Sequence, residues 1–201
     1  MSEYKSILKD NLWDNNPVFV QILGICSALA VTNNLINTSI MAISVIFVAG
    51  LTNFTVASIK HLIPGKVRMI IQTLIISFFV IIVDLLLRAY LPDISKSLGP
   101  YVGLIITNCI IMGRAEAFAQ LNKPLISLWD GITTGIGYMW ILMAIAFIRE
   151  LLGFGTLFGI LVMPEGFQTW TIMIMAPSAF FILGIAIWII NNIKLSKESS
   201  K

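Results

Sequence analysis

Charged residues are scarce in this chain, and their scarcity excludes most classes of soluble protein. Only 11% of the 201 residues are Asp, Glu, Lys or Arg, whereas 58% are hydrophobic and the mean hydropathy is +0.93. An ordinary soluble domain carries about 25% charged residues. The composition therefore predicts an all-α polytopic membrane protein, with residues 1–201 forming a single membrane domain and no separate soluble domain.

Cysteine and histidine are almost absent. The two cysteines, Cys26 and Cys109, lie far apart in apolar runs, so we expect no structural disulfide between them. The single histidine, His61, is expected to be a solvated loop residue. No basic tract suits nucleic acid, and the N-terminus lacks the pattern of a signal peptide, so insertion is expected to use the helices themselves.

Long apolar runs are what the chain does contain, and six of them predict six transmembrane helices. The stretch Arg149–Trp170, between the last two, is rich in glycine and is expected to form an interfacial or re-entrant loop. The six segments are Pro17–Thr32, Leu35–Ile59, Val67–Leu87, a short one from Tyr101, roughly Leu128–Ile148, and Thr171–Ile193.

The distribution of Lys and Arg predicts the orientation of these helices. With a cytoplasmic N-terminus, all basic residues except Arg88, Lys96 and Arg149 fall on the cytoplasmic side. Cytoplasmic loops carry the excess of positive charge in membrane proteins. Both termini are therefore predicted to be cytoplasmic.

The first and fourth apolar segments are short and have the same layout. Cys26 lies nine residues after Pro17, and Cys109 lies nine residues after Pro100, so each is about 13 Å into a helix that starts at its proline. Three helices in each half, about 17–90 and 100–193, would make the halves inverted repeats. With helices 1 and 4 short or broken, this arrangement predicts two thiols that face each other at the membrane midplane.

Two interpretations of the cysteines remain open at this point. Each can be a small buried apolar residue, as free cysteine often is. Their symmetric placement instead favours a ligand role, because thiolates bind Fe–S clusters, copper(I) or zinc. A [2Fe–2S] cluster ordinarily takes four protein ligands, so this chain would have to share one with two cysteines of another subunit.

Small and polar residues surround both cysteines. Such residues would allow a cluster to approach the backbone, and its sulfurs could accept hydrogen bonds from them. Small residues also mediate ordinary helix packing in membranes. Both roles stay open for these residues, which are Gly24, Ser27, Thr107, Asn108 and Gly113.

Acidic residues inside membrane segments are costly and need a partner or a function. Asp84 is expected to pair with Arg88, four residues later on one helix. Asp130 is expected at the start of the fifth helix, either as its N-cap or as a ligand in a cation path. Asp84 is a second candidate for that path.

Two further charged pairs lie close in the sequence. Arg114 and Glu116 do not share a helical face, so each is expected to pair with another element or subunit. Arg149 and Glu150 are expected to form an interfacial pair.

Four stretches of the chain carry a family resemblance. LGICSALAVT (23–32), VGLIITNCIIMGRAEAFA (102–119), FIRELLGFGTLFG (147–159) and MAPSAFF (175–181) resemble the D-subunit family of the sodium-translocating NADH:quinone oxidoreductase. The resemblance covers nearly the whole chain, from Asn16 to Trp188. The same broader family contains the E subunit of that complex and the E subunit of the Rnf ferredoxin:NAD oxidoreductase, which is the nearest alternative.

The resemblance implies a function for the two cysteines. In the family, the D and E subunits pair as inverted homologues, and each donates two midplane cysteines to one intramembrane [2Fe–2S] cluster; Cys26 and Cys109 match these positions. It also implies a subunit of a translocase in the bacterial inner membrane, not catalytic alone, that relays electrons coupled to Na⁺ export. FAD, FMN and riboflavin would belong to other subunits. From the residues alone, a secondary transporter with inverted repeats and a scaffold subunit remain alternatives.

Overall fold

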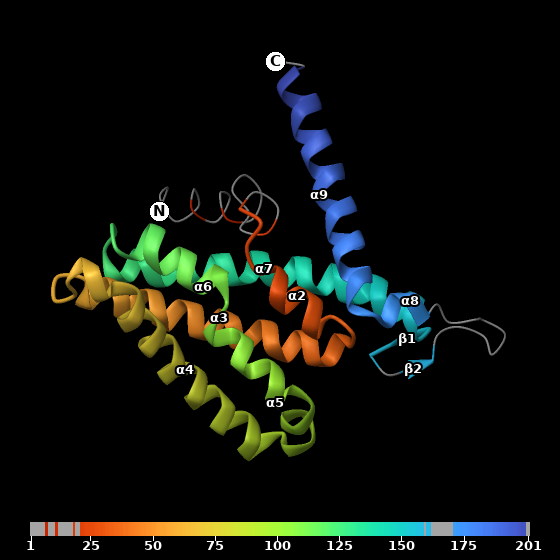
Figure 1. Ribbon diagram of the computed structural model, residues 1–201, viewed down its shortest axis with the longest axis horizontal. Coiled ribbons are helices and arrows are strands. Elements are labelled where there is room, and N and C mark those ends of the chain that lie inside the picture. Colours follow the sequence, from red (N-terminus) through yellow and green to blue (C-terminus); the bar gives the residue numbers. More distant parts are fainter. Residues whose placement is uncertain are drawn as a thin grey trace.

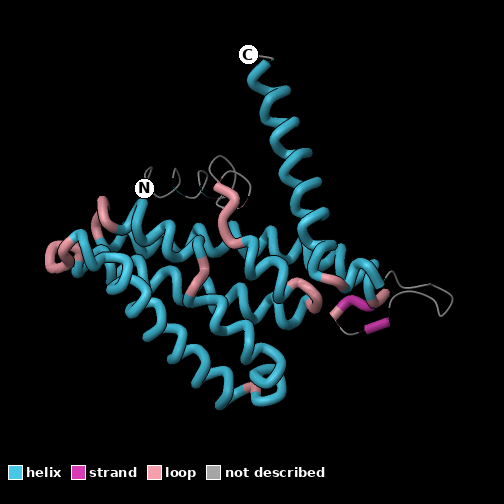
Figure 2. The backbone as a smooth tube through the Cα atoms, viewed as in Figure 1, coloured by secondary structure: helices cyan, strands magenta, loops and turns pink. Residues whose placement is uncertain are grey.

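Helices form almost all of the structure, a computed structural model that describes residues 7, 11, 18, 21–158, 160–161 and 171–199 (Figures 1 and 2). The only strands in these ranges, β1 (Thr156–Leu157) and β2 (Ile160–Leu161), pair antiparallel in a short hairpin. The helices are α2 (Ile25–Val31), α3 (Leu35–Ile59), α4 (Arg68–Tyr90), α5 (Pro92–Ile106), α6 (Cys109–Arg114), α7 (Pro124–Gly153), α8 (Thr171–Ile174) and α9 (Ala176–Ser199), with a 3-10 turn at Gly65–Val67 and a π-helix at Ala115–Ala119.

Several helices are long and apolar enough to cross a membrane. Within the described residues there are 4 such spans, Leu35–Ile59, Gly65–Tyr90, Leu98–Ala119 and Pro124–Gly153, and a shorter apolar helix at Pro177–Ile193. A chain with several such spans is a multi-pass membrane protein, as the composition predicts. The six-helix inverted repeat stays a prediction, because the first predicted helix, Pro17–Thr32, lies partly outside the described residues.

The centre of the fold is an antiparallel pair of helices, α3 and α7 (Figure 1). Two glycines four residues apart on α7 let the backbones approach closely. A Cβ on Gly131 would lie 2.6 Å from the carbonyl oxygen of Ala49, and one on Gly135 would lie 2.8 Å from Ile46 Cγ1. Small residues at this spacing are the usual means by which membrane helices pack at short range.

The fourth predicted helix is broken, but its bounds differ from those predicted. We expected a short or broken helix from Tyr101; instead α5 begins at Pro92, includes Pro100 and ends at Ile106, and α6 begins at Cys109. Asn108 makes this break possible because its side chain accepts a hydrogen bond from the N–H of Ile110 and caps the new helix. The chain then continues past Gly113 into the π-helix.

The first predicted helix is also interrupted. Residues 22–24 are not helical, and α2 begins at Ile25 after Gly24, whose φ of 81° lies in the left-handed region that favours glycine. Cys26 therefore lies in the first turn of α2 rather than nine residues into a helix from Pro17. Pro17 itself lies outside the described residues.

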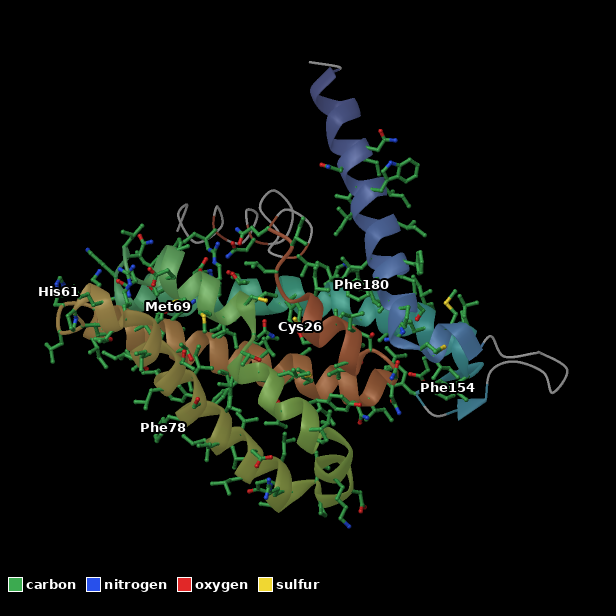
Figure 3. The ribbon with its side chains drawn as sticks, in the orientation of Figure 1. Cys26, His61, Met69, Phe78, Phe154 and Phe180 are labelled. Carbon is green, nitrogen blue, oxygen red and sulfur yellow. The ribbon has the colours of Figure 1, made fainter. Side chains whose placement is uncertain are left out.

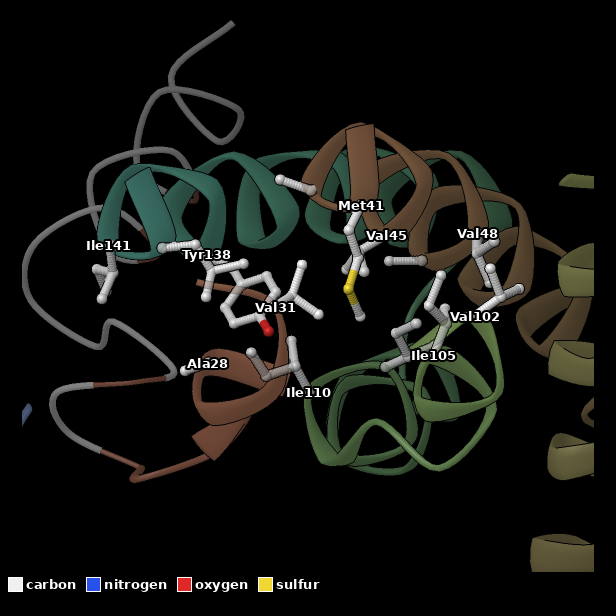
Figure 4. Close-up of a cluster of buried hydrophobic side chains, with 14 of the residues drawn as sticks. Ala28, Val31, Met41, Val45, Val48, Val102, Ile105, Ile110, Tyr138 and Ile141 are labelled. Atoms are coloured by element: carbon white, nitrogen blue, oxygen red, sulfur yellow. The ribbon is translucent and has the colours of Figure 1, made fainter. Parts of the chain in front are cut away.

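One apolar core joins these broken helices to the central pair. Figure 4 shows buried residues of α2, α3, α5, α6 and α7 meeting in it. Burial of these side chains holds the starts of α2 and α6 against the middle of α7. Its members include Ala28, Val31, Met41, Val45, Val48, Val102, Ile105, Ile110, Tyr138 and Ile141.

The last predicted segment, Thr171–Ile193, is divided at Met175 into α8 and α9. Ser178, Ala179 and Leu183 are buried near the start of α9, and the helix then rises away from the bundle (Figure 1). Before it, α7 extends through Arg149 to Gly153, and the β1–β2 hairpin follows. Residues 162–170 of the expected re-entrant loop lie outside the described residues.

Candidate functional site

The starts of the two cysteine-bearing helices lie against each other. The backbone N–H of Gly24, two residues before Cys26, donates a hydrogen bond of 3.4 Å to Sγ of Cys109. Gly24 is buried, and a Cβ at this position would lie 2.6 Å from Ile110 Cδ1. Only glycine fits both this contact and the left-handed backbone, so Gly24 allows the two turns to meet.

The two thiols differ in exposure. Cys26, labelled in Figure 3, is exposed, whereas Cys109 is half-buried. Both are free, as expected from the sequence. Each lies in the first turn of a short helix, next to a break in the chain.

A tyrosine that the sequence analysis missed lies beside them. Tyr138, on α7, is fully buried, and its hydroxyl is hydrogen-bonded to that of Ser27. Asn108 donates from Nδ2 to Ser27 Oγ at 3.4 Å. A tyrosine within an apolar, Gly-rich helix was the available signal, because a buried phenol usually has a hydrogen-bond partner.

The remaining neighbours of the cysteines occupy different places. Thr107 is the C-cap residue that follows α5, and it is exposed. Gly113 lies on α6, where a Cβ would be 3.2 Å from Leu23 Cδ1, so it is a point of close helix packing. Gly24, Ser27 and Asn108 are thus the predicted environment residues that the structure brings together around Cys109 and Tyr138.

Asp130 has a different position from the one predicted. It is not an N-cap, because α7 begins at Pro124 with Lys123 as its cap residue. Its fully buried carboxylate accepts from Nε of Arg114 at 3.0 Å and from a terminal nitrogen of the same guanidinium. It also accepts from Asn11 Nδ2 at 2.9 Å, and that amide donates to Thr133 Oγ1 at 2.9 Å.

The other charged residue near the break also pairs with a different helix. Glu116 forms an ion pair with Arg68 at the start of α4 and accepts from Gln72 Nε2 at 2.9 Å. Arg114 and Glu116 therefore pair with α7 and α4, respectively. This confirms the prediction that each would reach another element.

Arg149 and Glu150 are not paired with each other, and the predicted interfacial pair is wrong. Both side chains are buried. The Arg149 guanidinium donates to backbone carbonyls of α2 and α8, and the Glu150 carboxylate accepts from the N–H of Leu35 at 2.6 Å. Side chains at adjacent positions of a helix point in different directions, so Arg149 and Glu150 each have different partners.

Two further polar predictions, for Asp84 with Arg88 and for His61, are confirmed. Arg88 and Asp84 form an ion pair of 2.8 Å near the end of α4. His61 is exposed in the turn after α3, far from Cys26 in Figure 3. No group of three or more His, Cys, Asp or Glu side chains in the described part of the chain could hold a metal ion alone.

A few buried polar atoms have no hydrogen-bond partner among the described residues. They include the hydroxyls of Thr52 and Thr134 and both amide atoms of Asn53. Thr52 and Asn53 lie on α3, and Thr134 lies on α7, four residues after Asp130.

Comparison with known proteins gives one consistent result. A family described as Rnf-Nqr subunit, membrane protein, matches residues 4–187. The D subunit of the Na⁺-translocating NADH-quinone reductase of Chlamydia pneumoniae is 47% identical over 208 residues, which cover 98% of this chain and 97% of that protein. The protein of the same name from Psychromonas ingrahamii is 48% identical over 205 residues, which cover 100% of this chain and 98% of its own length.

Proposed function

The chain belongs to the Rnf-Nqr family of membrane subunits, and on that basis we propose that it is the D subunit of a Na⁺-translocating NADH:quinone oxidoreductase. Relatives that carry this name at 46–48% identity favour it over the Rnf alternative. In this proposal Cys26 and Cys109 are two of the four ligands of a [2Fe–2S] cluster, and a homologous E subunit supplies the other two.

One observation carries the assignment of the ligands: the hydrogen bond from the Gly24 N–H to Cys109 Sγ. It brings the first turn of α2, which carries Cys26, against the sulfur of Cys109. Hydrogen bonds from backbone N–H groups to cysteine sulfur are a typical feature of iron–sulfur sites.

The donor set fits a cluster that is shared between chains. Soft thiolates suit iron–sulfur chemistry, and the chain has only two of them. The exposed side chain of Cys26 leaves a face that a partner subunit can cover. When bound, such a cluster supplies one-electron transfer.

The residues of this chain have three tasks in the proposal. Cys26 and Cys109 hold the sulfurs, the Gly24 N–H stabilises negative charge on one of them, and buried apolar neighbours such as Ala28 and Ile110 exclude water from the inner side. The sequence contains no motif that suggests a flavin site, so FAD, FMN and riboflavin are assigned to other subunits of the complex.

We place the cation path, if it enters this chain, near Asp130 rather than Asp84. Asp130 is fully buried and lies next to Thr133 and Thr134, whereas Asp84 lies near the end of α4 in a pair with a well-exposed Arg88. The Asp130 carboxylate is held by Arg114. A Na⁺ ion could therefore bind to the Asp130 carboxylate only after the ion pair with Arg114 opens.

The proposed orientation has both termini on the cytoplasmic side of a bacterial inner membrane. Lys60 donates to the carbonyl oxygen of Asn122 at 2.8 Å, and Arg68 pairs with Glu116, so the turn between α3 and α4 lies beside the turn before α7, at the same end of the bundle. This grouping supports the orientation that the Lys and Arg distribution predicts.

Electron paramagnetic resonance of the reduced complex tests the proposal. Cys26→Ala and Cys109→Ala should each abolish the signal of one [2Fe–2S] centre while the flavins of the complex remain bound. A wild-type signal in either variant would show that these thiols are not its ligands. Iron analysis of the chain purified alone should give no stoichiometric cluster, because half of the ligands would be missing.

A further inference from the structure

Tyr138 lies where the two halves of the proposed ligand site meet. Its side chain is fully buried on α7, among residues of α2, α3 and α6 (Figure 4). Its hydroxyl bonds to Ser27, which follows Cys26, and Ser27 in turn bonds to Asn108, which precedes Cys109. One phenol is thus connected to the residues next to both cysteines.

The hydrogen-bonding capacity of Ser27 fixes the direction of these bonds. A serine hydroxyl has one proton to donate and two lone pairs to accept. The Ser27 proton goes to the carbonyl oxygen of Gly24 at 3.0 Å, and the Asn108 amide donates to Ser27 Oγ. With its proton on the carbonyl oxygen of Gly24, Ser27 accepts from Tyr138, which we assign as the donor, and every hydrogen-bonding position of Ser27 is then used.

Asn108 is oriented just as strictly. Its Oδ1 accepts from the N–H of Ile110 at 3.1 Å and caps α6, so its Nδ2 is the group that faces Ser27. The amide thus joins the cap of the Cys109 helix to the turn that carries Cys26. A displacement of Ser27 would therefore move both the cap of the Cys109 helix and the turn that carries Cys26.

We propose that Tyr138 is a positioning residue for the two cysteines: by donating to Ser27 it holds the Gly24 turn against α6 and keeps the Gly24 N–H on Cys109 Sγ. The proposal rests on the proposed function in that the two sulfurs bind a cluster. The positioning role goes beyond the proposed function because it belongs to a residue of the central helix pair that has no hydrogen bond to either sulfur.

The tyrosine ring and hydroxyl have separable effects. A Cβ on Gly24 would lie 2.9 Å from Tyr138 Cε2, so the ring itself packs against the Gly24 turn. Tyr138→Phe keeps this packing and removes only the donor. A purely structural role of the ring would therefore survive the substitution.

The first measurement is a redox titration of the complex, followed through the paramagnetic signal that depends on Cys26 and Cys109. In Tyr138→Phe the N–H···S bond should lengthen and stabilise the reduced cluster less. At a fixed ambient potential the ratio of reduced to oxidised cluster should fall about tenfold, which is a shift of about 59 mV for one electron. Ser27→Ala should shift the ratio in the same direction, and the double variant should shift it by less than the sum, because both act through one network.

Tyr90→Phe is the matched control. It removes the same hydroxyl from a side chain that is 80% exposed at the end of α4, and it should leave the signal and the potential unchanged. A wild-type potential and wild-type g-values in Tyr138→Phe would overturn the proposal. If Tyr138→Phe does not assemble, the Ser27→Ala variant serves instead, because it removes the partner of the Tyr138 hydroxyl without adding a charge; a wild-type potential there would also overturn the proposal.

A second measurement does not depend on the cluster. In the full-length chain purified without iron, a short bifunctional thiol reagent should link Cys26 to Cys109, and Tyr138→Phe should slow this reaction about tenfold, because small misplacements of reacting groups have large effects on rate. An unchanged rate would disprove the positioning role. Loss of the proposed function would appear differently, as a cluster signal that persists in Cys26→Ala and Cys109→Ala.

Discussion

Arg149 and Glu150, adjacent on α7, stabilise opposite ends of different helices. Arg149 donates to the carbonyl oxygens of Leu29, near the end of α2, and of Ile174, at the end of α8. Glu150 accepts from the N–H of Leu35, the first residue of α3. A cation at helix C-termini and an anion at a helix N-terminus both complement the helix dipole and satisfy backbone groups that lack partners within the helix.

Replacing Arg149 should therefore destabilise the protein strongly. Arg149→Met removes the side-chain donor to the carbonyl oxygens of Leu29 and Ile174, and each unsatisfied buried group costs about 1–3 kcal/mol. Arg149→Lys keeps the charge but carries three donors on one nitrogen where arginine has five donors on three nitrogens, so it should recover only part of the loss. Thermal unfolding of the purified complex in detergent measures the series, and equal stability of all three proteins would contradict the assigned role.

Breaking the ion pair of Arg114 and Asp130 should also be costly. Asp130 is 0% exposed, and removal of one partner of a buried pair typically costs about 3–5 kcal/mol. Asp130→Asn and Arg114→Met should each lower the stability of the complex, and the double variant should lose less than the sum because no charge is left unpaired. Strictly additive losses in this double-mutant cycle would show that the two side chains do not depend on each other.

The same variants separate stability from cation transport. If Asp130 contributes to the cation path, Asp130→Asn should raise the Na⁺ concentration needed for half-maximal turnover, whereas Arg114→Met should not remove a ligand for Na⁺. Turnover measured against Na⁺ concentration, under conditions where both variants remain assembled, distinguishes the two effects. An unchanged Na⁺ dependence in Asp130→Asn would exclude this residue from the path.

The pair of Arg68 and Glu116 should contribute much less. Its side chains are 37% and 35% exposed, and exposed ion pairs contribute about 0–1 kcal/mol and are screened by salt. Glu116→Gln should therefore leave the unfolding temperature of the complex nearly unchanged. A loss as large as that of Asp130→Asn would mean that a neighbouring subunit buries this pair.

The glycines between α3 and α7 should not tolerate a side chain. In Gly131→Ala the new methyl group would lie 2.6 Å from the carbonyl oxygen of Ala49, a backbone atom that cannot move without separating the helices. Overpacking of this kind costs about 1–3 kcal/mol. Gly184→Ala on α9, where no described atom lies within 4 Å of the new Cβ, is the control and should keep wild-type stability. Equal stability of the two variants would disprove the close approach of α3 and α7.

Local breaks in the chain were only partly predictable. The sequence indicated short or broken helices around both cysteines, because charged or polar residues end the apolar runs there. It misplaced the breaks, since Pro100 lies inside α5 and the interruption occurs at Thr107 and Asn108. An asparagine can cap a helix wherever tertiary contacts permit the helix to be interrupted. The sequence does not show where those contacts occur.

By itself, the sequence determined the class of this protein, the bounds of α3, the family, and the two residues with the chemistry of a soft-metal ligand. These follow from composition and from local apolar patterns, which depend on the residues of one segment at a time. Only the tertiary structure decided that Gly24 meets Cys109, that the hydroxyls of Tyr138 and Ser27 are hydrogen-bonded, and that Arg149 and Glu150 bind different helices. Each of these contacts joins residues that are distant in the chain, and their directions depend on how buried helices pack against one another.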